Sequence, residues 1–528
     1  MADTTQSLEQ SLWNSANILR SKMDANEYKN YTLGLIFYKY LSDNMLYHVA
    51  DLLEVPTQDL KIAQENYQTA FSDEETQVDL IDALQQDLSY YIKPELTFTA
   101  QVMSIENHTF QLENLAQGFN DVERASETFS GLFDDIDLYS KKLGPTLQKQ
   151  NDTISAVMMQ LVSLDVAGHS GDTLSDAYEY LIGQFASDSG KNAGEFYTPQ
   201  AVSRLMTQIM MKGRENQKGL SVYDAAMGSG SLLLNAKRYS KESDTINYFG
   251  QELNTSTYNL ARMNMILHGV PISNQYLHNA DTLDADWPTE EPTNFDGVMM
   301  NPPYSAKWSA EKGFLTDPRF STFGVLAPKS KADYAFLLHG YYHLKSSGVM
   351  AIVLPHGVLY RGAAEGKIRQ KLLEEGAIDT VIGLPAGIFY NTSIPTTVII
   401  LKKNRTTKDV FFIDASKEFE KRKAQNFLTD AHIDKILEAY QNREDMEKFA
   451  HLASFDEIVE NDYNLNIPRY VDTFEEEPPI DLVALSKEIT DLNAEIAKTE
   501  QEFLSLLGEL AETDETKEMI EATKAIFR

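Results

Sequence analysis

Seven short apolar runs alternate with helical stretches in the middle of this chain, and this alternation constrains the fold more than any other feature. Strands that alternate with helices favour a mostly parallel sheet covered on both faces. We therefore predict an α/β domain over residues 166–410. The expected strands are Leu220–Tyr223, Tyr248–Gln251, Gln275–Leu277, Gly297–Met300, Val349–Leu354, Thr380–Gly383 and Thr397–Leu401.

Two flanking regions read differently from the sheet. Residues 1–165 carry apolar residues at three- and four-residue steps, which predicts an all-helical N-terminal domain with docking and support as its roles. Because the sheet is expected to end near Lys403, residues 411–474 are predicted to form a helical or irregular extension.

The C-terminal region, residues 475–528, begins with an acidic, proline-bearing linker and continues with a heptad pattern. A narrow apolar stripe at alternating steps of three and four is typical of a coiled coil, although a helix packed on its own chain would show it too. We predict a helical tail that docks a partner chain. The stripe consists of Leu482, Leu485, Ile489, Leu492, Ile496, Thr499, Phe503, Leu506 and Leu510.

Composition limits the compartment and the substrate. The chain has no cysteine, begins without the basic and apolar regions of a signal peptide, and contains no apolar run of the ~20 residues that span a bilayer. We therefore expect a cytoplasmic protein without membrane contact. The formal net charge is −33. Because affinity for duplex DNA depends on cationic side chains, either the substrate is not a polyanion or another subunit supplies the basic surface.

A glycine turn follows the first expected strand. Asp224 directly follows that strand. After Ala225-Ala226-Met227, two glycines alternate with two serines, and glycines allow a backbone to approach a ligand closely. The turn alone is a weak signal, and it is shorter than the dinucleotide-binding fingerprint. The turn residues are Gly228, Ser229, Gly230 and Ser231.

Acidic residues also follow the next two strands. Glu252 ends the second strand, where a carboxylate accepts hydrogen bonds from ribose hydroxyls. Asp281 follows the third strand and is a candidate acceptor for an adenine amino group. Upstream, Thr198 is a possible helix N-cap with Pro199 at the first helical position, and the segment is a second candidate for cofactor contacts. That segment consists of Glu195, Phe196, Tyr197, Thr198, Pro199 and Gln200.

Asn301-Pro302-Pro303-Tyr304 comes directly after the fourth expected strand. The Asn301 amide oxygen and the Pro302 carbonyl can both accept hydrogen bonds from one exocyclic amino group. That pairing draws the nitrogen lone pair out of conjugation and presents it to an electrophilic methyl donor. Tyr304 offers a flat face on which a flipped-out base can stack. We interpret this turn as a catalytic site that holds an amine.

With these motifs in place, the chain resembles the S-adenosylmethionine-dependent amino-methyltransferases, and more closely the methylation subunit of type I restriction–modification systems. Nearly the whole chain takes part in the resemblance. It depends on the segments described above and on three further segments whose chemistry the residues alone do not explain. These are Leu354-Pro355-His356-Gly357-Val358-Leu359, Gly383-Leu384-Pro385-Ala386-Gly387-Ile388-Phe389 and Asn464-Leu465-Asn466-Ile467-Pro468-Arg469-Tyr470.

The resemblance implies a Rossmann-like methyltransferase sheet and methylation of adenine N6 in duplex DNA. It also implies S-adenosylmethionine as cofactor, a DNA specificity subunit, a restriction subunit and two copies of this chain per complex. No metal is required, and we interpret His268, His339, His343 and His356 as structural. Ala226-Met227 and Ser229 stand where relatives often carry Cys, Gly or Thr, which is a departure from the family's turn.

Further expectations concern the base and the DNA backbone. Phe389 or Tyr390 is expected to sandwich the base opposite Tyr304. Two alternatives remain open, a methyltransferase acting on a protein glutamine side chain and a non-catalytic scaffold of the same fold. Cations in the loop 305–333 are candidate phosphate contacts, namely Lys307, Lys312, Arg319, Lys329 and Lys331.

Overall fold

The computed structural model describes residues 13–164, 180–185, 197–389, 393–422, 425–473, 481–509, 513 and 516–526. The chain divides into two compact units, Met1–Thr473 and Phe474–Arg528. None of the described helices is long and apolar enough to cross a bilayer.

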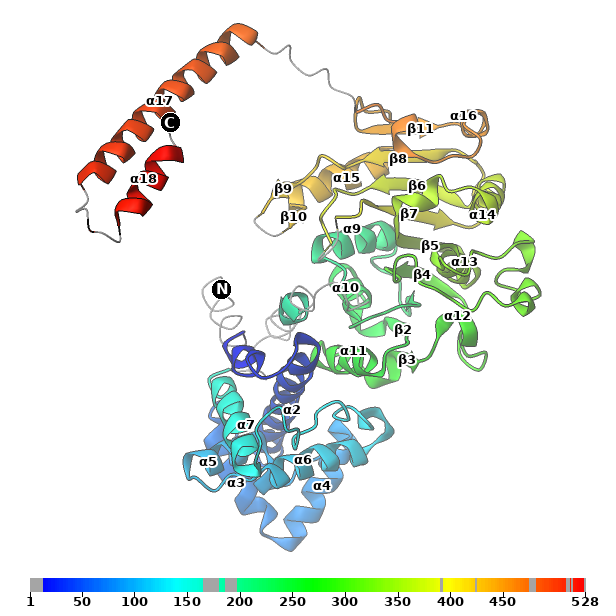
Figure 1. Cartoon of the computed structure of the whole chain (residues 1–528). Coiled ribbons are helices and arrows are strands. Elements are labelled where there is room, and N and C mark those ends of the chain that lie inside the picture. The colour runs from blue at the N-terminus through cyan, green and yellow to red at the C-terminus, as the bar shows by residue number, and fades with distance from the viewer. Residues whose placement is uncertain are drawn as a thin grey trace. The chain divides into compact units, whose positions relative to one another are not determined.

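The first part of the larger unit is a helical domain (Figure 1). Its longest helix, α2, buries Leu33, Phe37 and Leu41 completely or almost completely, as the three- and four-residue spacing predicts. Thr146 caps α7 by accepting a hydrogen bond from the backbone N–H of Lys149. The helices are α2 (Ala25–Leu52), α3 (Leu60–Phe71), α4 (Glu74–Leu88), α5 (Phe98–Glu106), α6 (Leu112–Ala125) and α7 (Leu147–Leu161).

A nine-stranded sheet forms the second part of the larger unit, in the order β11-β8-β6-β7-β5-β4-β1-β2-β3. All seven expected strands are present, and the expected α/β class with a helical N-terminal domain is confirmed. The strands are β1 (Ser221–Asp224), β2 (Asn247–Glu252), β3 (Gln275–Asn279), β4 (Phe295–Met300), β5 (Leu344–Pro355), β6 (Ile378–Gly383), β7 (Thr396–Lys402), β8 (Val410–Asp414) and β11 (Ala450–Ala453), with a separate hairpin of β9 (Glu420–Lys421) and β10 (Asn426–Phe427).

The expectation that the sheet ends near Lys403 is wrong. Strand β8 pairs in parallel with β6, and β11 pairs antiparallel with β8. The region 411–474 therefore contributes two strands to the main sheet. It also contributes helix α15, whose Ile433 and Ile436 pack into the core on one face of that sheet.

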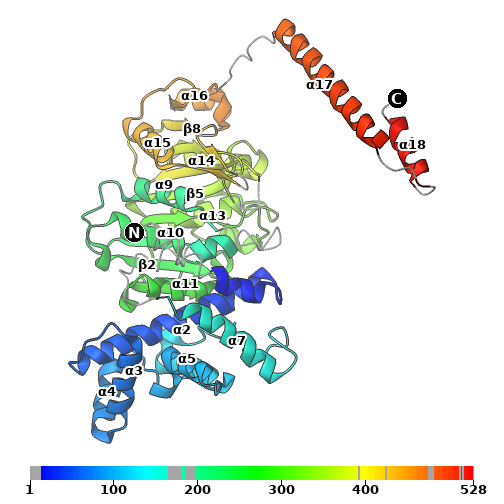
Figure 2. The ribbon, with the colours of Figure 1, turned by 90° about the vertical axis from the view of Figure 1, so that its left-hand side faces the viewer.

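Helices cover both faces of the sheet (Figures 1 and 2). Along β5, Val349, Ala351 and Val353 belong to one buried cluster, whereas the residues between them belong to the other. This alternation follows from the two-residue period of a strand. The helices are α9 (Gln200–Met211), α10 (Ser231–Tyr239), α11 (Thr255–Leu267), α12 (Thr282–Ala285), α13 (Asp333–Tyr342), α14 (Ala363–Glu374), α15 (Asp430–Asn442) and α16 (Phe455–Glu460).

The helical domain packs against the sheet domain through α11. Leu260, Met263 and Leu267 of α11 are buried in the core of the helical domain. Asn30 of α2 donates a hydrogen bond to the hydroxyl of Ser256 over 2.9 Å. These contacts place α2 beside the carboxyl ends of the first strands.

The smaller unit contains α17 (Leu482–Glu509) and α18 (Lys517–Ile526). Helix α17 buries none of its residues, so the part of the expected stripe that lies on this helix, from Leu482 to Leu506, is not covered within the smaller unit. Leu492 and Ile496, for example, are 51% and 54% exposed.

Candidate active site

The candidate site lies where the order of the strands reverses. Strand β1 pairs with β2 on one side and with β4 on the other, and all three pairs β1–β2, β1–β4 and β2–β3 are parallel. Open α/β sheets bind ligands at the carboxyl ends of strands beside such a switch point. Asp224 ends β1 and Asn301 follows β4, so both residues lie at this crevice.

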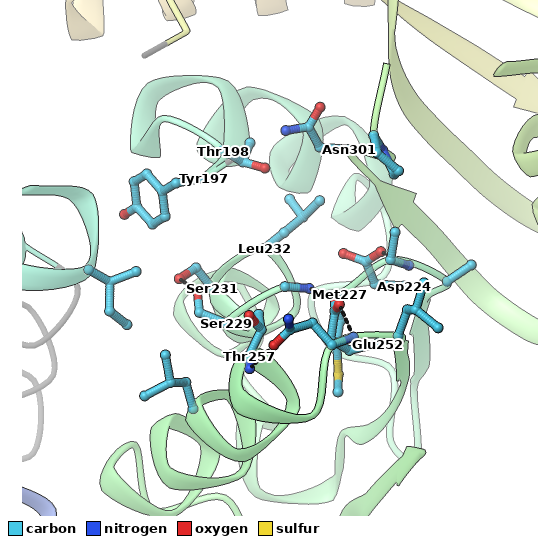
Figure 3. A pocket seen from close by; sticks show the side chains of 18 of the residues that line it. Tyr197, Thr198, Asp224, Met227, Ser229, Ser231, Leu232, Glu252, Thr257 and Asn301 are labelled. Carbon is cyan, nitrogen blue, oxygen red and sulfur yellow. Dashed lines mark hydrogen bonds between the residues drawn. The ribbon is translucent and has the colours of Figure 1, made fainter. Parts of the chain in front are cut away.

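A cavity of about 720 Å³ opens at the switch point, and most of the predicted site residues line it (Figure 3). Volumes of this size are typical of small-molecule sites. Pro199, Gln200, Gly230, Pro302 and Tyr304 do not line it. The predicted residues that do are Tyr197, Thr198, Asp224, Gly228, Ser229, Ser231, Glu252, Asp281, Asn301 and Pro303.

The glycine turn is tied to the second strand. Glu252 accepts a hydrogen bond from the backbone N–H of Gly228 over 3.1 Å, and Met227 donates its N–H to the carbonyl of Gln251. Gly228 and Gly230 both have a positive φ, +56° and +78°. A Cβ at residue 230 would lie 3.2 Å from Met265 of α11, so glycine permits a close approach there.

Asp224 is the most perturbed acid of the cavity. It is 2% exposed, and burial raises the pKa of its carboxyl to about 8, against the hydrogen bond that it accepts from the Ala226 backbone N–H. The negative charge of Glu252 raises this pKa further. The cavity therefore holds a carboxyl group whose ionisation a cationic ligand would favour.

Asp281 has a structural task as well. Its carboxylate accepts hydrogen bonds from the backbone N–H groups of Leu283 and Asp284, which caps the short helix α12. Asp281 is exposed at the cavity rim.

At the catalytic turn, the hydroxyl of Tyr304 donates to the amide oxygen of Asn301 over 2.8 Å. Burial raises the pKa of Tyr304 well above its ordinary value, so the hydroxyl keeps its proton. An amide oxygen can accept two hydrogen bonds, and this one accepts the bond from Tyr304.

Tyr304 and Phe389, which we predict to lie on opposite sides of a bound base, are neighbours in the structure. The two ring centroids are 6.0 Å apart, but the ring planes meet at 80°, and Phe389 is buried in the core. Edge-to-face packing is a favoured arrangement of two aromatic rings. Tyr390 lies outside the described residues, as do Glu195 and Phe196.

The start of α9 differs by one residue from the prediction. Pro199 itself is the N-cap and Gln200 is the first helical residue, so Thr198 does not cap the helix and lines the cavity instead. Gln200 donates to the hydroxyl of Tyr197 over 3.1 Å and accepts from Asn235 of α10. These bonds fix Tyr197 at the cavity wall.

The helical domain and the segment after it also line the cavity, which the sequence did not indicate. Lys29 and Leu33 come from α2, and Ile182 and Phe185 lie before α9 in the chain. Their pattern in the sequence indicates only helix packing. Lys29 is 8% exposed and is the one Lys or Arg among the described residues of the cavity lining.

The sequence suggested that Arg319 is an exposed phosphate contact, but its side chain is buried. It is 2% exposed, pairs with Asp317, and donates to the carbonyls of Thr282 and Leu283 on α12. A buried guanidinium with this many acceptors anchors the loop to the sheet domain. The loop cations Lys307, Lys312 and Lys329 are exposed.

A cluster of Asp286, His339 and His343 was missed because Asp286 lies more than 50 residues before the two histidines in the sequence. Their ligand atoms lie within 4.8 Å of one another, the geometry of a metal site. However, Arg319 donates to Nδ1 of His339 over 3.2 Å and lies 3.5 Å from Asp286. The guanidinium of Arg319 therefore joins His339 and Asp286 in one internal network of hydrogen bonds and ion pairs.

The site combines three features: an acidic residue at or just after the end of each of three parallel strands, a ligand cavity, and an Asn-Pro-Pro-Tyr turn after the fourth strand. Together these features define an amino-methyltransferase. A family model described as N-6 DNA Methylase matches residues 169–478, and one described as HsdM N-terminal domain matches residues 8–161. The chain belongs to the N-6 DNA methylase family, among the methylase subunits of type I restriction–modification systems.

Individual relatives agree with this assignment over most of the chain. The MpnII methylase subunit of Mycoplasma pneumoniae is 36% identical over 92% of this chain and 93% of its own length. The MjaVII methylase subunit of Methanocaldococcus jannaschii is 32% identical over 95% and 83%. A type I methyltransferase subunit from Streptococcus thermophilus, solved by crystallography, is 72% identical, covers 89% of this chain and 100% of its own, and superposes with a TM-score of 0.88. The chain is thus a modification subunit that methylates adenine N6 in DNA.

Proposed function

We propose that the cavity binds S-adenosylmethionine and that the turn at residues 301–304 holds the adenine amine in front of it. The observation that carries this proposal is that Asp224, Glu252 and Asn301 line one cavity at the switch point. Membership of a methylase family implies this cofactor.

The residues of the cavity fit the cofactor in charge and shape. Asp224 and Glu252 suit its cationic and hydroxyl groups, and Lys29 suits its carboxylate. A Cβ at Gly228 would meet no atom within 4 Å, so the turn leaves open space on the cavity side. We assign Asp281 to the adenine end, and Tyr197, Thr198 and Lys29 to the methionine end.

The chain's own residues bind and orient the reactants. When bound, S-adenosylmethionine supplies an electrophilic methyl group, so the protein needs no covalent nucleophile. Asn301 Oδ1 and the Pro302 carbonyl accept hydrogen bonds from the adenine amine, which must first leave the base stack at a cost of a few kcal/mol. The protein's contribution is alignment of the amine with the methyl group.

Replacement of Asn301 by alanine tests the proposal. The Asn301→Ala variant should lose methylation of DNA by the assembled complex by at least about 100-fold, because alignment and polarisation of the amine are lost together. Isothermal titration calorimetry should find unchanged binding of S-adenosylhomocysteine. Asn294→Ala is the matched control, because Asn294 is exposed just before the other end of β4. Full activity of the Asn301 variant would refute the assignment.

The chain works as part of a type I complex, and we further propose its partners. A net charge of −33 disfavours duplex binding by this chain alone, so a DNA specificity subunit would supply the basic surface. The exposed apolar stripe of α17 fits a helical partner, and it would dock that subunit. A restriction subunit and a second copy of this chain would complete the assembly.

Gel-shift experiments test whether DNA binding requires the specificity subunit or whether this chain binds duplex DNA by itself. The isolated chain should bind duplex DNA weakly, and addition of the specificity subunit should produce a sequence-specific shift. Tight, sequence-specific binding by the chain alone would contradict the proposal. Labelled methyl transfer should reach DNA rather than protein, which distinguishes the DNA enzyme from a glutamine methyltransferase and from an inactive scaffold.

A further inference from the structure

The residue directly after the catalytic turn has an unusual backbone. Ser305 has a φ of +52°, in the left-handed region that serine rarely adopts. Its N–H belongs to the peptide that leaves Tyr304, and it donates a 2.7 Å hydrogen bond to Oδ1 of Asp333. A strained conformation persists only where the surroundings hold it. Asp333 therefore fixes the peptide that sets the direction of Tyr304.

Asp333 is the first residue of α13 and is 1% exposed. Its second carboxylate oxygen pairs with Arg361, which also pairs with the buried Glu365 at 2.9 Å. A buried carboxylate needs a cationic partner to remain charged. The carbonyl of Arg361 in turn accepts from Arg369 of α14. Together, the side chains of Asp333, Arg361, Glu365 and Arg369 anchor the turn to helices α13 and α14.

The same bonds close the base of the loop 305–333. Beside the Ser305–Asp333 bond, Ala332 donates its N–H to the carbonyl of Ala306 over 2.9 Å. The exposed loop cations lie beyond these two bonds. Movement of the loop on contact with a phosphate backbone would therefore leave the catalytic turn in place.

We propose that Asp333, paired with Arg361, is a positioning residue that holds residue 305 in the left-handed region. The Tyr304 hydroxyl thereby stays on Asn301 Oδ1 and fixes the orientation of the amide toward the target amine. Asp333 does not line the cavity, and it acts through the backbone of the turn. This inference rests on the proposed function of Asn301.

The most direct test removes the Asp333 carboxylate and then restores the left-handed backbone at residue 305 by placing glycine there. Asp333→Ala should lower the kcat of DNA methylation by the assembled complex about tenfold, with the Kd for S-adenosylhomocysteine unchanged. Glycine adopts positive φ about as readily as negative φ. The double variant Asp333→Ala with Ser305→Gly should therefore recover at least a threefold higher kcat than Asp333→Ala alone.

Ser330→Gly is the matched control, because Ser330 is exposed in the same loop and glycine there should give no recovery. Asp333→Asn, which keeps an acceptor at Oδ1, should lose less activity than Asp333→Ala, and it supplies the comparison if the alanine variant does not fold. Two results would overturn the proposal: normal kcat in Asp333→Ala, or equal recovery from Ser305→Gly and Ser330→Gly. If Asn301→Ala were fully active, the proposed function would fail instead, whatever the Asp333 variants do.

Discussion

Replacement of Asp224 by asparagine should stabilise the protein and weaken cofactor binding at the same time. The unfolded carboxyl has a pKa of about 3.9, whereas burial raises the folded value to about 8. Between these values the folded state keeps a proton that the unfolded state has lost. Stability therefore falls as pH rises through this window, by about 1.4 kcal/mol per pH unit.

The structure limits how large this effect is. From pH 5.5 to 7.5 the full slope amounts to roughly 3 kcal/mol. Because Asp224 borders an open cavity, water screens part of the cost, and we expect about 1–2 kcal/mol. Asparagine is nearly isosteric, can still accept from the Ala226 N–H, and carries no charge. The variant should therefore lack this part of the pH dependence.

Urea unfolding at the two pH values, followed by tryptophan fluorescence, measures the difference. Trp287 and Trp308 are buried in the sheet domain and report on it. Asp296→Asn is the control, because its effect on stability should have the opposite sign. Burial raises the pKa of Asp296, but Lys345 and Ser221 outweigh this and lower it below its usual value. That variant should lose stability at pH 7.5. Equal pH dependence in wild type and Asp224→Asn would refute the reasoning.

Three further predictions follow from the same contacts. Lys29→Met should weaken binding of S-adenosylhomocysteine about tenfold in calorimetry. Binding of methylthioadenosine, which lacks the carboxylate, should stay unchanged. Equal losses for the two ligands would contradict the assignment of Lys29 to the methionine end. Arg319→Ala should destabilise the protein by about 3–5 kcal/mol in urea unfolding, whereas Lys312→Ala on the same loop should stay within about 0.5 kcal/mol. Leu492→Asp with Ile496→Asp should abolish assembly with the specificity subunit in size-exclusion chromatography without changing cofactor affinity, and an intact complex would count against α17 as the docking helix.

Local pattern was enough to predict the strands that carry the site. The runs that became β1, β2 and β4 are short, apolar and followed by polar residues, so both the strands and their tips are visible in the sequence. Strand β8 follows the charged stretch after Lys402, which suggested the end of the sheet. Strand β11 has the sequence Ala-His-Leu-Ala, which favours no strand by itself. It forms because β8 offers an unpaired edge, and such non-local pairing cannot be read from a window of residues.

The same limit applies to the site. Asp224, Glu252 and Asn301 were predictable because parallel strands bring their tips to one edge. Lys29 reaches the cavity only because α2 packs against α11, a contact between segments more than 200 residues apart (256 − 30 = 226). Arg319 looked like a phosphate contact because its loop is polar and rich in cations, yet its side chain turns inward to carbonyls on α12. Tertiary contacts decided both cases.

The acidity of the chain agrees with the proposed division of labour between this chain and a DNA specificity subunit. A sulfonium cofactor is cationic at its reacting end, and carboxylates at the strand tips suit it better than a basic cleft would. The salt-dependent affinity for duplex DNA, in contrast, comes from Lys and Arg, and the described loop beside the turn exposes only a few of them. If Lys307, Lys312 and Lys329 contact the backbone in the assembled complex, their joint replacement by glutamine should lower the slope of log K against log salt by about 3, at roughly 0.9 per contact. An unchanged slope would exclude these three lysines as phosphate contacts.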